Sequence, residues 1–115
     1  MGLGFSHGDA HWAYSGFDRF RVKLAREIGI NLDLMDGFCE KGGISWSKVK
    51  DDIVPLLNHS DCDGELTVEE CKKIWPRLKE LIKDWEEGNR DKRGAYRLIE
   101  GMKEAIKMNE PLEFG

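Results

Sequence analysis

Apolar residues recur three or four positions apart along most of the chain, the spacing of helices that bury one face. Runs that alternate β-branched and polar residues, as half-buried strands do, are missing from the sequence. We therefore expect an all-α fold, with about four helices in one small domain that spans residues 1–115. The predicted helices run from just after Ser15 to Ile28, from Ser45 or Ser47 to Leu57, from Val68 to Trp85 and from Arg90 to Met108.

The predicted helices divide this domain into recognisable segments. Residues 1–15 are rich in glycine and aromatic side chains, and we expect them to be irregular. Residues 45–85 form a helix-loop-helix unit at the centre of the chain, and residues 89–108 form the C-terminal helix. Pro55 and Pro76 fall inside the second and third predicted helices, so we expect these helices to kink or to end early.

The net charge of −4 hides a strong local excess of acidic residues. No Lys or Arg lies between Lys50 and Lys72, whereas seven acidic residues do. Leaving these seven out of the 22 acidic residues leaves 15, against 18 Lys and Arg in the whole chain. The basic residues are scattered along the sequence, which argues against a nucleic-acid partner. The seven acids are Asp51, Asp52, Asp61, Asp63, Glu65, Glu69 and Glu70.

The loop between the second and third predicted helices carries the sequence DCDGELTVEE at residues 61–70. This sequence resembles the calcium-binding loop of EF-hand proteins, whose pattern is D-x-[DN]-x-[DN]-G-x5-E between two helices. Gly64 would allow the sharp turn that such a loop makes around the ion. The resemblance implies a Ca²⁺ site with oxygen ligands from Asp61, Asp63, the backbone carbonyl of Glu65, Thr67 and Glu70.

The first ligand of this loop is open between two residues. Counting back strictly from Asp61 places His59 at the first position, where the family has Asp and where imidazole is a poor calcium ligand. Counting from the apolar positions of the incoming helix places Asn58 there instead, in a loop lengthened to 13 residues. We favour Asn58, because its amide supplies a neutral oxygen, and keep His59 as the alternative.

A second interpretation of the same residues needs no metal. Thr67 is a good N-cap residue, and Glu70 follows it by three positions, which is the spacing of a capping box at the start of a helix. The two interpretations are compatible, because a capping box and a calcium loop use these positions in the same local fold.

Short sequence features bear on the binding partners of the protein and on its cellular compartment. A single EF-hand often pairs with a second one, so a homodimer is a hypothesis alongside a different protein partner. Residues 1–6 fit the pattern for N-myristoylation at Gly2, but no basic cluster follows, and no apolar run is long enough to cross a membrane. Three cysteines form an odd set, which favours a reducing, cytoplasmic setting over a disulfide framework.

The sequence predicts a non-enzymatic protein, since no serine or cysteine stands in a nucleophile motif and so short a chain leaves little wall for a catalytic cleft. We therefore expect no catalytic residues and no organic cofactor. The first hypothesis is a calcium-binding or calcium-stabilised module that acts through a protein partner. The alternative is a metal-free adaptor or inhibitor built on an EF-hand-like scaffold. The whole chain resembles small bacterial or phage-type proteins with one such loop, a resemblance that implies no activity.

Overall fold

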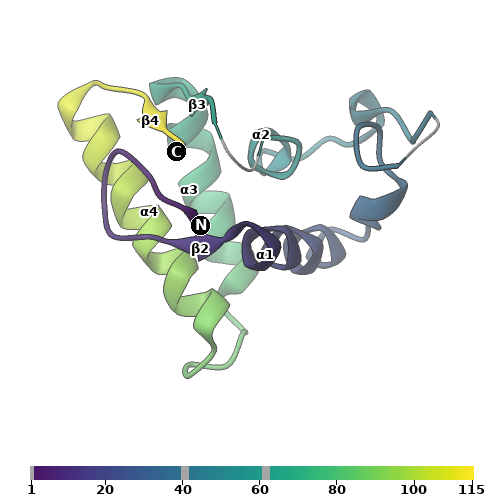
Figure 1. Ribbon diagram of the computed structural model, residues 1–115, viewed down its shortest axis with the longest axis horizontal. Coiled ribbons are helices and arrows are strands. Elements are labelled where there is room, and N and C mark those ends of the chain that lie inside the picture. The colour runs from purple at the N-terminus through teal and green to yellow at the C-terminus, as the bar shows by residue number, and fades with distance from the viewer. Residues whose placement is uncertain (1, 40–41, 61–62) are drawn as a thin grey trace.

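The computed structural model describes residues 2–39, 42–60 and 63–115. Its elements are β1 (Gly2–Leu3), β2 (Trp12–Ala13), α1 (Tyr14–Glu27), α2 (Val54–Leu57), β3 (Glu65–Leu66), α3 (Val68–Ile82), α4 (Arg90–Met108) and β4 (Leu112–Glu113). Two 3-10 turns, η1 (Leu32–Leu34) and η2 (Trp46–Lys48), lie between α1 and α2. Figure 1 shows α3 and α4 side by side, α1 crossing them, and the segment between α1 and α2 extending away from the other helices.

The expectation of an all-α fold is wrong, because the helices are accompanied by two small antiparallel sheets. In the first sheet Leu3 of β1 pairs with Trp12 of β2, inside the segment that we expected to be irregular. In the second sheet Leu66 of β3 pairs with Leu112 of β4. Each strand has two residues, which is too short to produce the alternating pattern from which strands are inferred. The fold is therefore helical with two short sheets that fasten its ends.

The second predicted helix is also wrong. Ser45 begins only the 3-10 turn η2, with its hydroxyl accepting a hydrogen bond from the Ser47 backbone N–H at 3.3 Å. The α-helix starts later, at Val54, and Pro55 stands in its first turn rather than in its interior. Proline fits the first turn of a helix because its missing N–H would have no partner there. The helix that enters the candidate loop is therefore only four residues long.

The other three helices follow the predicted pattern closely. Helix α4 covers Arg90–Met108, as expected. Helix α1 begins one residue before Ser15, and Gly29, which follows it, has a φ of 79° that suits a helix end. Helix α3 begins at Val68 as expected and ends at Ile82 rather than at Trp85, with Pro76 accommodated inside it.

The buried core joins these elements. Phe17, Phe20 and Leu24 of α1 are fully buried, and Leu66 and Leu112 add the central pair of the second sheet to the same cluster. The cluster is completed from α3 and α4 by Ile74, Leu78, Ile82, Leu98, Ile99 and Met102. The C-terminal strand thus holds the loop between α2 and α3 against the core.

Candidate functional site

His59 lies over the loop that resembles an EF-hand. Its Nε2 atom is 3.0 Å from the backbone carbonyl oxygen of Glu65, and its Nδ1 atom is 2.9 Å from the carbonyl oxygen of Ser60. A carbonyl oxygen only accepts, so both bonds form together when the ring carries two N–H groups and a positive charge. The Glu65 carbonyl is the group that the EF-hand resemblance assigns to calcium. The imidazole therefore takes a bond that the ion would take.

The imidazole ring of His59 makes two further close contacts. It stacks on the ring of Phe114, with the centroids 3.9 Å apart. It also lies so close to Gly64 that a Cβ on that glycine would stand 3.1 Å from the ring. Gly64 has a φ of 91°, a conformation that side chains rarely adopt, so this turn requires glycine for two reasons.

The C-terminal segment closes the loop from outside. The Phe114 backbone N–H donates to the carbonyl oxygen of Gly64 at 2.8 Å, next to the pairing of β3 with β4. EF-hand loops usually make such a short β contact with a second loop. Here the loop makes this contact within its own chain. The contact therefore does not require a second subunit, and the homodimer stays a prediction.

Arg21 of α1 satisfies the carbonyl groups at the entrance to the loop. Its side chain is 3% exposed, and its guanidinium donates to the carbonyl oxygens of Leu57, at 3.4 Å, and of His59. The same group lies over the rings of Phe17 and Phe38, 4.9 and 5.2 Å from their centroids. A cation at the carboxyl end of a helix is favourable, because the carbonyl dipoles point toward it. An arginine therefore supplies positive charge where α2 meets the loop.

The predicted capping box between Thr67 and Glu70 is confirmed. The Glu70 backbone N–H donates to the Thr67 hydroxyl at 3.1 Å, and the Thr67 N–H donates to Glu70 Oε1 at 2.9 Å. The Glu70 carboxylate is therefore bonded to the start of α3. One carboxylate oxygen, Oε1, is thus engaged, whereas a bidentate ligand of an ion uses both oxygens.

Two acidic residues near the loop, Asp51 and Glu69, have basic partners of their own. Arg77 of α3 holds Asp51 with two nearly parallel bonds, Nε to Oδ1 at 3.0 Å and Nη2 to Oδ2 at 2.8 Å. The hydrogen bond from this guanidinium holds the pKa of the Asp51 carboxyl below its ordinary value, although partial burial opposes the shift. Glu69 pairs with Lys72 at 3.3 Å on the same helix. Asp51 and Glu69 thus each have a basic partner on α3.

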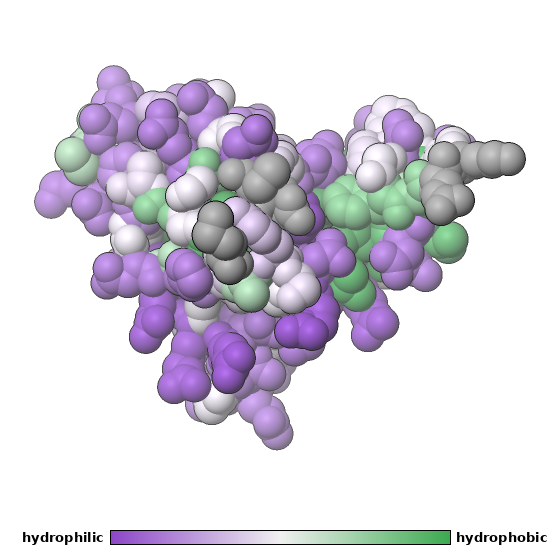
Figure 2. Space-filling view, viewed as in Figure 1, coloured by the Kyte–Doolittle hydropathy of each residue, from purple (hydrophilic) through white to green (hydrophobic). Residues whose placement is uncertain are grey.

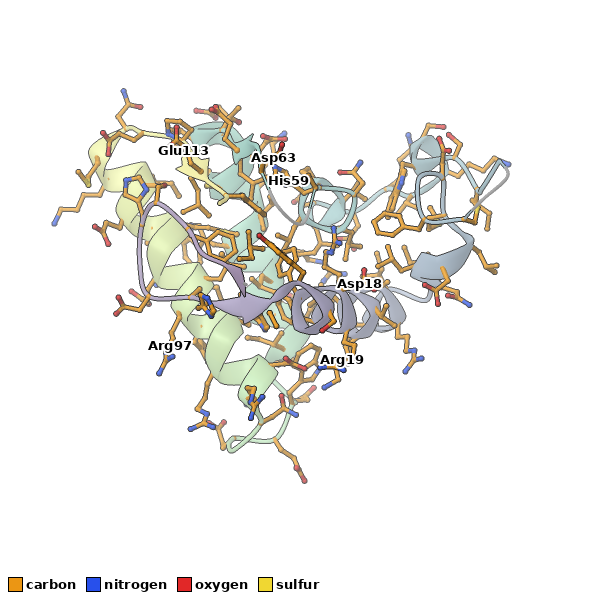
Figure 3. All side chains as sticks on the ribbon, in the orientation of Figure 1. Asp18, Arg19, His59, Asp63, Arg97 and Glu113 are labelled. Atoms are coloured by element: carbon orange, nitrogen blue, oxygen red, sulfur yellow. The ribbon has the colours of Figure 1, made fainter. Side chains whose placement is uncertain are left out.

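The remaining predicted ligands do not complete a calcium site among the described residues. Asn58 is exposed and faces a surface hollow of about 380 Å³ that Asp18 and Phe38 also line. Asp63 is exposed, and Figure 3 shows it next to His59. Asp61 lies outside the described residues. Within the described ranges, no three His, Cys, Asp or Glu side chains gather closely enough to hold a metal ion.

The structure also brings together residues that sequence reasoning missed. His7 Nε2 donates to Glu110 Oε1 at 2.9 Å, and its Nδ1 is 2.7 Å from the Ser6 hydroxyl. The hydroxyl also accepts a bond from the Glu113 N–H at 2.9 Å, and Glu104, Glu110 and Glu113 line the same surface hollow as Ser6. Such negative surroundings oppose the oxyanion that a serine nucleophile would generate. The arrangement ties the two ends of the chain, and their separation in sequence leaves no local signal.

The comparisons with known proteins come to one result. Searches against protein-family models, curated proteins and solved structures find no match to this chain.

Two shorter predictions concern membranes. Within the described part of the chain, no helix combines the length and the hydrophobicity needed to cross a bilayer. Gly2, which the acylation pattern would modify, pairs with Ala13 in the first sheet. The absence of a membrane partner stays a prediction, with N-myristoylation at Gly2 as its alternative.

Proposed function

We propose that this chain is a non-enzymatic protein-interaction module, an adaptor or an inhibitor, whose EF-hand-like unit is a scaffold that needs no calcium. The observation that carries the proposal is the His59 side chain, hydrogen-bonded to the Glu65 carbonyl and stacked on Phe114. In such a scaffold, N–H groups of the protein bind the loop carbonyls in place of an ion and so maintain the geometry of the loop. Its structure is then independent of the cation concentration around it.

The segment between α1 and α2 supports a protein partner. Leu34 is 55% exposed and Ile44 is 47% exposed. The two residues are joined by a backbone hydrogen bond, from the Ile44 N–H to the Leu34 carbonyl at 2.9 Å. Figure 2 shows hydrophobic residues gathered over this projecting part of the molecule. Exposed apolar side chains that lie together on a projection are typical of protein-binding surfaces.

Thermal unfolding tests the metal-free scaffold. The wild-type chain is melted in 1 mM calcium, in 1 mM magnesium and in excess chelator, all at about 0.15 M ionic strength so that screening is constant. The proposal expects the same Tm in all three solutions. A Tm that rises with calcium alone would contradict it and favour the calcium module.

A paired variant tests the interaction surface. Leu34→Ser/Ile44→Ser removes the two exposed apolar side chains of the projection, and Met108→Ser removes one that is equally exposed, at 55%, on α4. Affinity capture with each variant is followed by quantitative mass spectrometry. A partner held by the projection is lost with the double variant and retained with Met108→Ser. Equal retention by both would contradict this surface.

Calcium binding is the second candidate function, because the closing half of the loop keeps EF-hand features. Gly64 makes its turn with positive φ, and Thr67 and Glu70 stand at the spacing that the family uses. In this version an ion would displace His59, draw Glu70 out of the capping box and change the angle between α2 and α3. Glu70→Gln would then abolish a calcium-dependent rise in Tm while leaving the metal-free fold nearly intact.

We also propose a cytoplasmic setting. Cys71 of α3 is a buried free thiol. Burial raises the pKa of the Cys71 thiol to about 11, so it stays protonated and unreactive at neutral pH. Buried, unpaired thiols are typical of proteins in reducing compartments. Labelling with iodoacetamide in intact cells would find Cys39 reduced, whereas an oxidised Cys39 would contradict this setting.

A further inference from the structure

A positively charged hollow of about 370 Å³ lies where the start of α1 meets the start of α4. The permanent cations among its lining residues are Arg19, Lys23 and Arg90, and the carboxylate among them is Asp91. Three positive charges and one negative charge give this lining a net charge of about +2 while His11, which also lines the hollow, is neutral. A hollow of this size is large enough for a small ligand.

The carboxylate in this hollow is already engaged. Lys23 Nζ is 2.7 Å from Asp91 Oδ2, and the Trp12 indole N–H donates to Asp91 Oδ1 at 3.4 Å. The side chains of Arg19 and Arg90 make no hydrogen bond or ion pair with any residue that the structure describes. Two guanidinium groups therefore line one hollow whose carboxylate is bound elsewhere, which favours an anionic ligand.

The helix end contributes little to this attraction. The side chain of Asn89 already accepts bonds from the backbone N–H groups of Asp91, at 2.8 Å, and of Lys92, at 3.1 Å. The N-terminus of α4 is thus capped, and the positive character of the hollow comes from the arginine and lysine side chains.

Gly16 leaves space in the hollow on the side of α1. It lies inside that helix, where glycine is less favourable than alanine, and it lines the hollow. A Cβ at this position would meet Trp12 Cδ1 at 3.7 Å, which is an ordinary contact. Gly94 of α4 differs, because a Cβ there would stand 2.6 Å from the Trp12 ring. Packing against the described residues thus requires glycine at position 94 and not at position 16, where the missing side chain leaves room for a ligand.

We propose that this hollow binds a phosphomonoester dianion, the group that small phosphorylated molecules share with phosphorylated side chains. The second pKa of a phosphomonoester is about 6, so at neutral pH the group carries nearly two negative charges, which match the net charge of the lining. Guanidinium forks pair bidentately with phosphate oxygens, and Arg19 and Arg90 supply two forks. A carboxylate carries one charge only and would balance half of this lining. The inference does not depend on the state of the His59 loop.

Titrations of the isotope-labelled chain with inorganic phosphate, glycerol phosphate and acetate, followed by heteronuclear NMR, test the hollow. All are made at about pH 7.5, where the phosphates are mostly dianions, and at a constant ionic strength of about 0.15 M. The amide signals of Gly16 and Asp91 are expected to shift saturably with both phosphates, with a Kd of about 1 mM or lower. Acetate is expected to bind at least about tenfold more weakly.

Two double variants separate the hollow from the general charge of the chain. Arg19→Gln/Arg90→Gln should weaken phosphate binding about tenfold or more, because both forks are lost. Arg97→Gln/Lys107→Gln removes the same charge from exposed positions of α4 that do not line the hollow, and Figure 3 shows Arg97 across α4 from Arg19. This control should leave the affinity within about twofold.

Gly16→Ala tests the space in the hollow. Its methyl group should weaken phosphate binding several-fold, whereas Tm should stay the same or rise, because alanine is the better helix former. A phosphoserine peptide, with its unphosphorylated twin as control, distinguishes the two sources of the group. A Kd at least about tenfold below that of glycerol phosphate assigns the hollow to a phosphorylated protein, and comparable values assign it to small phosphomonoesters.

Four results would overturn the proposal. They are shifts that do not saturate with either phosphate, acetate binding as strong as phosphate binding, an equal loss with the two double variants, and wild-type affinity in Gly16→Ala. Circular dichroism checks that the variants fold, and Arg90→Gln alone replaces the first double variant should that one be unstable.

Discussion

The imidazole of His59 and the ring of Phe114 stack with their centroids 3.9 Å apart and their planes inclined by 25°. These residues come from the loop before α3 and from the residue after β4. Through this contact the C-terminal segment packs against the loop, at the position where EF-hand proteins place a second calcium loop. The EF-hand-like helix-loop-helix unit therefore finds its packing partner within the same chain.

Phe114→Ala is expected to destabilise the fold strongly. Phe114 is 6% exposed and makes edge-to-face contacts with Phe5, at 4.8 Å, and Phe17, at 6.2 Å, besides the stack on His59. Removing a buried phenyl ring costs about 3–5 kcal/mol in free energy of unfolding. Urea unfolding followed by circular dichroism measures this loss.

The exposed neighbour of Phe114 provides the control. Glu113→Ala keeps the backbone pairing of β4 with β3 and should change the free energy of unfolding by no more than about 0.5 kcal/mol. If Phe114→Ala cost no more than this control, the C-terminal segment would not hold the loop.

The pair of Asp51 and Arg77 predicts a specific dependence of stability on pH. The guanidinium lowers the pKa of Asp51 in the folded state from its ordinary value of 3.8. The stability gained from this pair is therefore present above pH 3.8 and is lost as the pH falls through the lower, folded-state pKa. Asp51→Asn should cost about 1 kcal/mol at neutral pH.

Urea unfolding at a series of pH values from neutral down to about pH 2 measures this difference. The wild-type and Asp51→Asn curves should converge at the acid end, where both residues are uncharged. A difference that stayed constant across the series would mean that the pair contributes through packing rather than charge.

Lys92 makes a stabilising contact that the pattern of apolar and polar positions does not indicate. This lysine is 2% exposed, and its ammonium group donates to the carbonyl oxygens of Lys83, at 3.1 Å, and Trp85, at 2.6 Å. It therefore holds the chain where it leaves α3. Lys92→Met should cost about 2 kcal/mol, because these carbonyl groups lose a charged donor.

Chemical denaturation compares Lys92→Met with Lys107→Met, an exposed lysine in the last turn of the same helix. The exposed substitution should cost at most about 1 kcal/mol. Similar costs for the two variants would show that the buried ammonium is not a structural contact.

The sequence predicts the long helices and the capping box well, because these depend on neighbouring residues. Helix α4 needs only its regular apolar positions and the Asn89 cap, and Thr67 and Glu70 meet within one turn. The two sheets depend on residues far apart, such as Leu66 and Leu112, and two-residue strands carry no pattern. Helix α2 failed because Pro55 was interpreted as a residue inside a helix instead of one that starts it.

The candidate loop was predicted by position, and the calcium chemistry predicted for it stays a prediction. The sequence identified the turn at Gly64 and both candidates for the first ligand. It could not show that His59 would bond to the Glu65 carbonyl, because that geometry depends on Phe114, more than 50 residues later. Likewise, Arg21 reaches the loop from α1 only in the folded chain.

His59→Asp tests the central claim, which is that this imidazole replaces a calcium ion. The substitution supplies the carboxylate that EF-hand loops use first and removes the ring that holds the Glu65 carbonyl. The variant should therefore gain a calcium response that the wild-type chain lacks. Asn58→Asp adds the same charge one residue earlier and is the matched control.

The decisive measurement is the Tm of wild type, His59→Asp and Asn58→Asp in calcium and in chelator. At calcium concentrations about ten times the Kd, binding adds about 1.4 kcal/mol, or roughly 5 °C in Tm. The account predicts this rise for His59→Asp alone. A calcium-dependent rise in the wild-type chain, or in Asn58→Asp without one in His59→Asp, would contradict it.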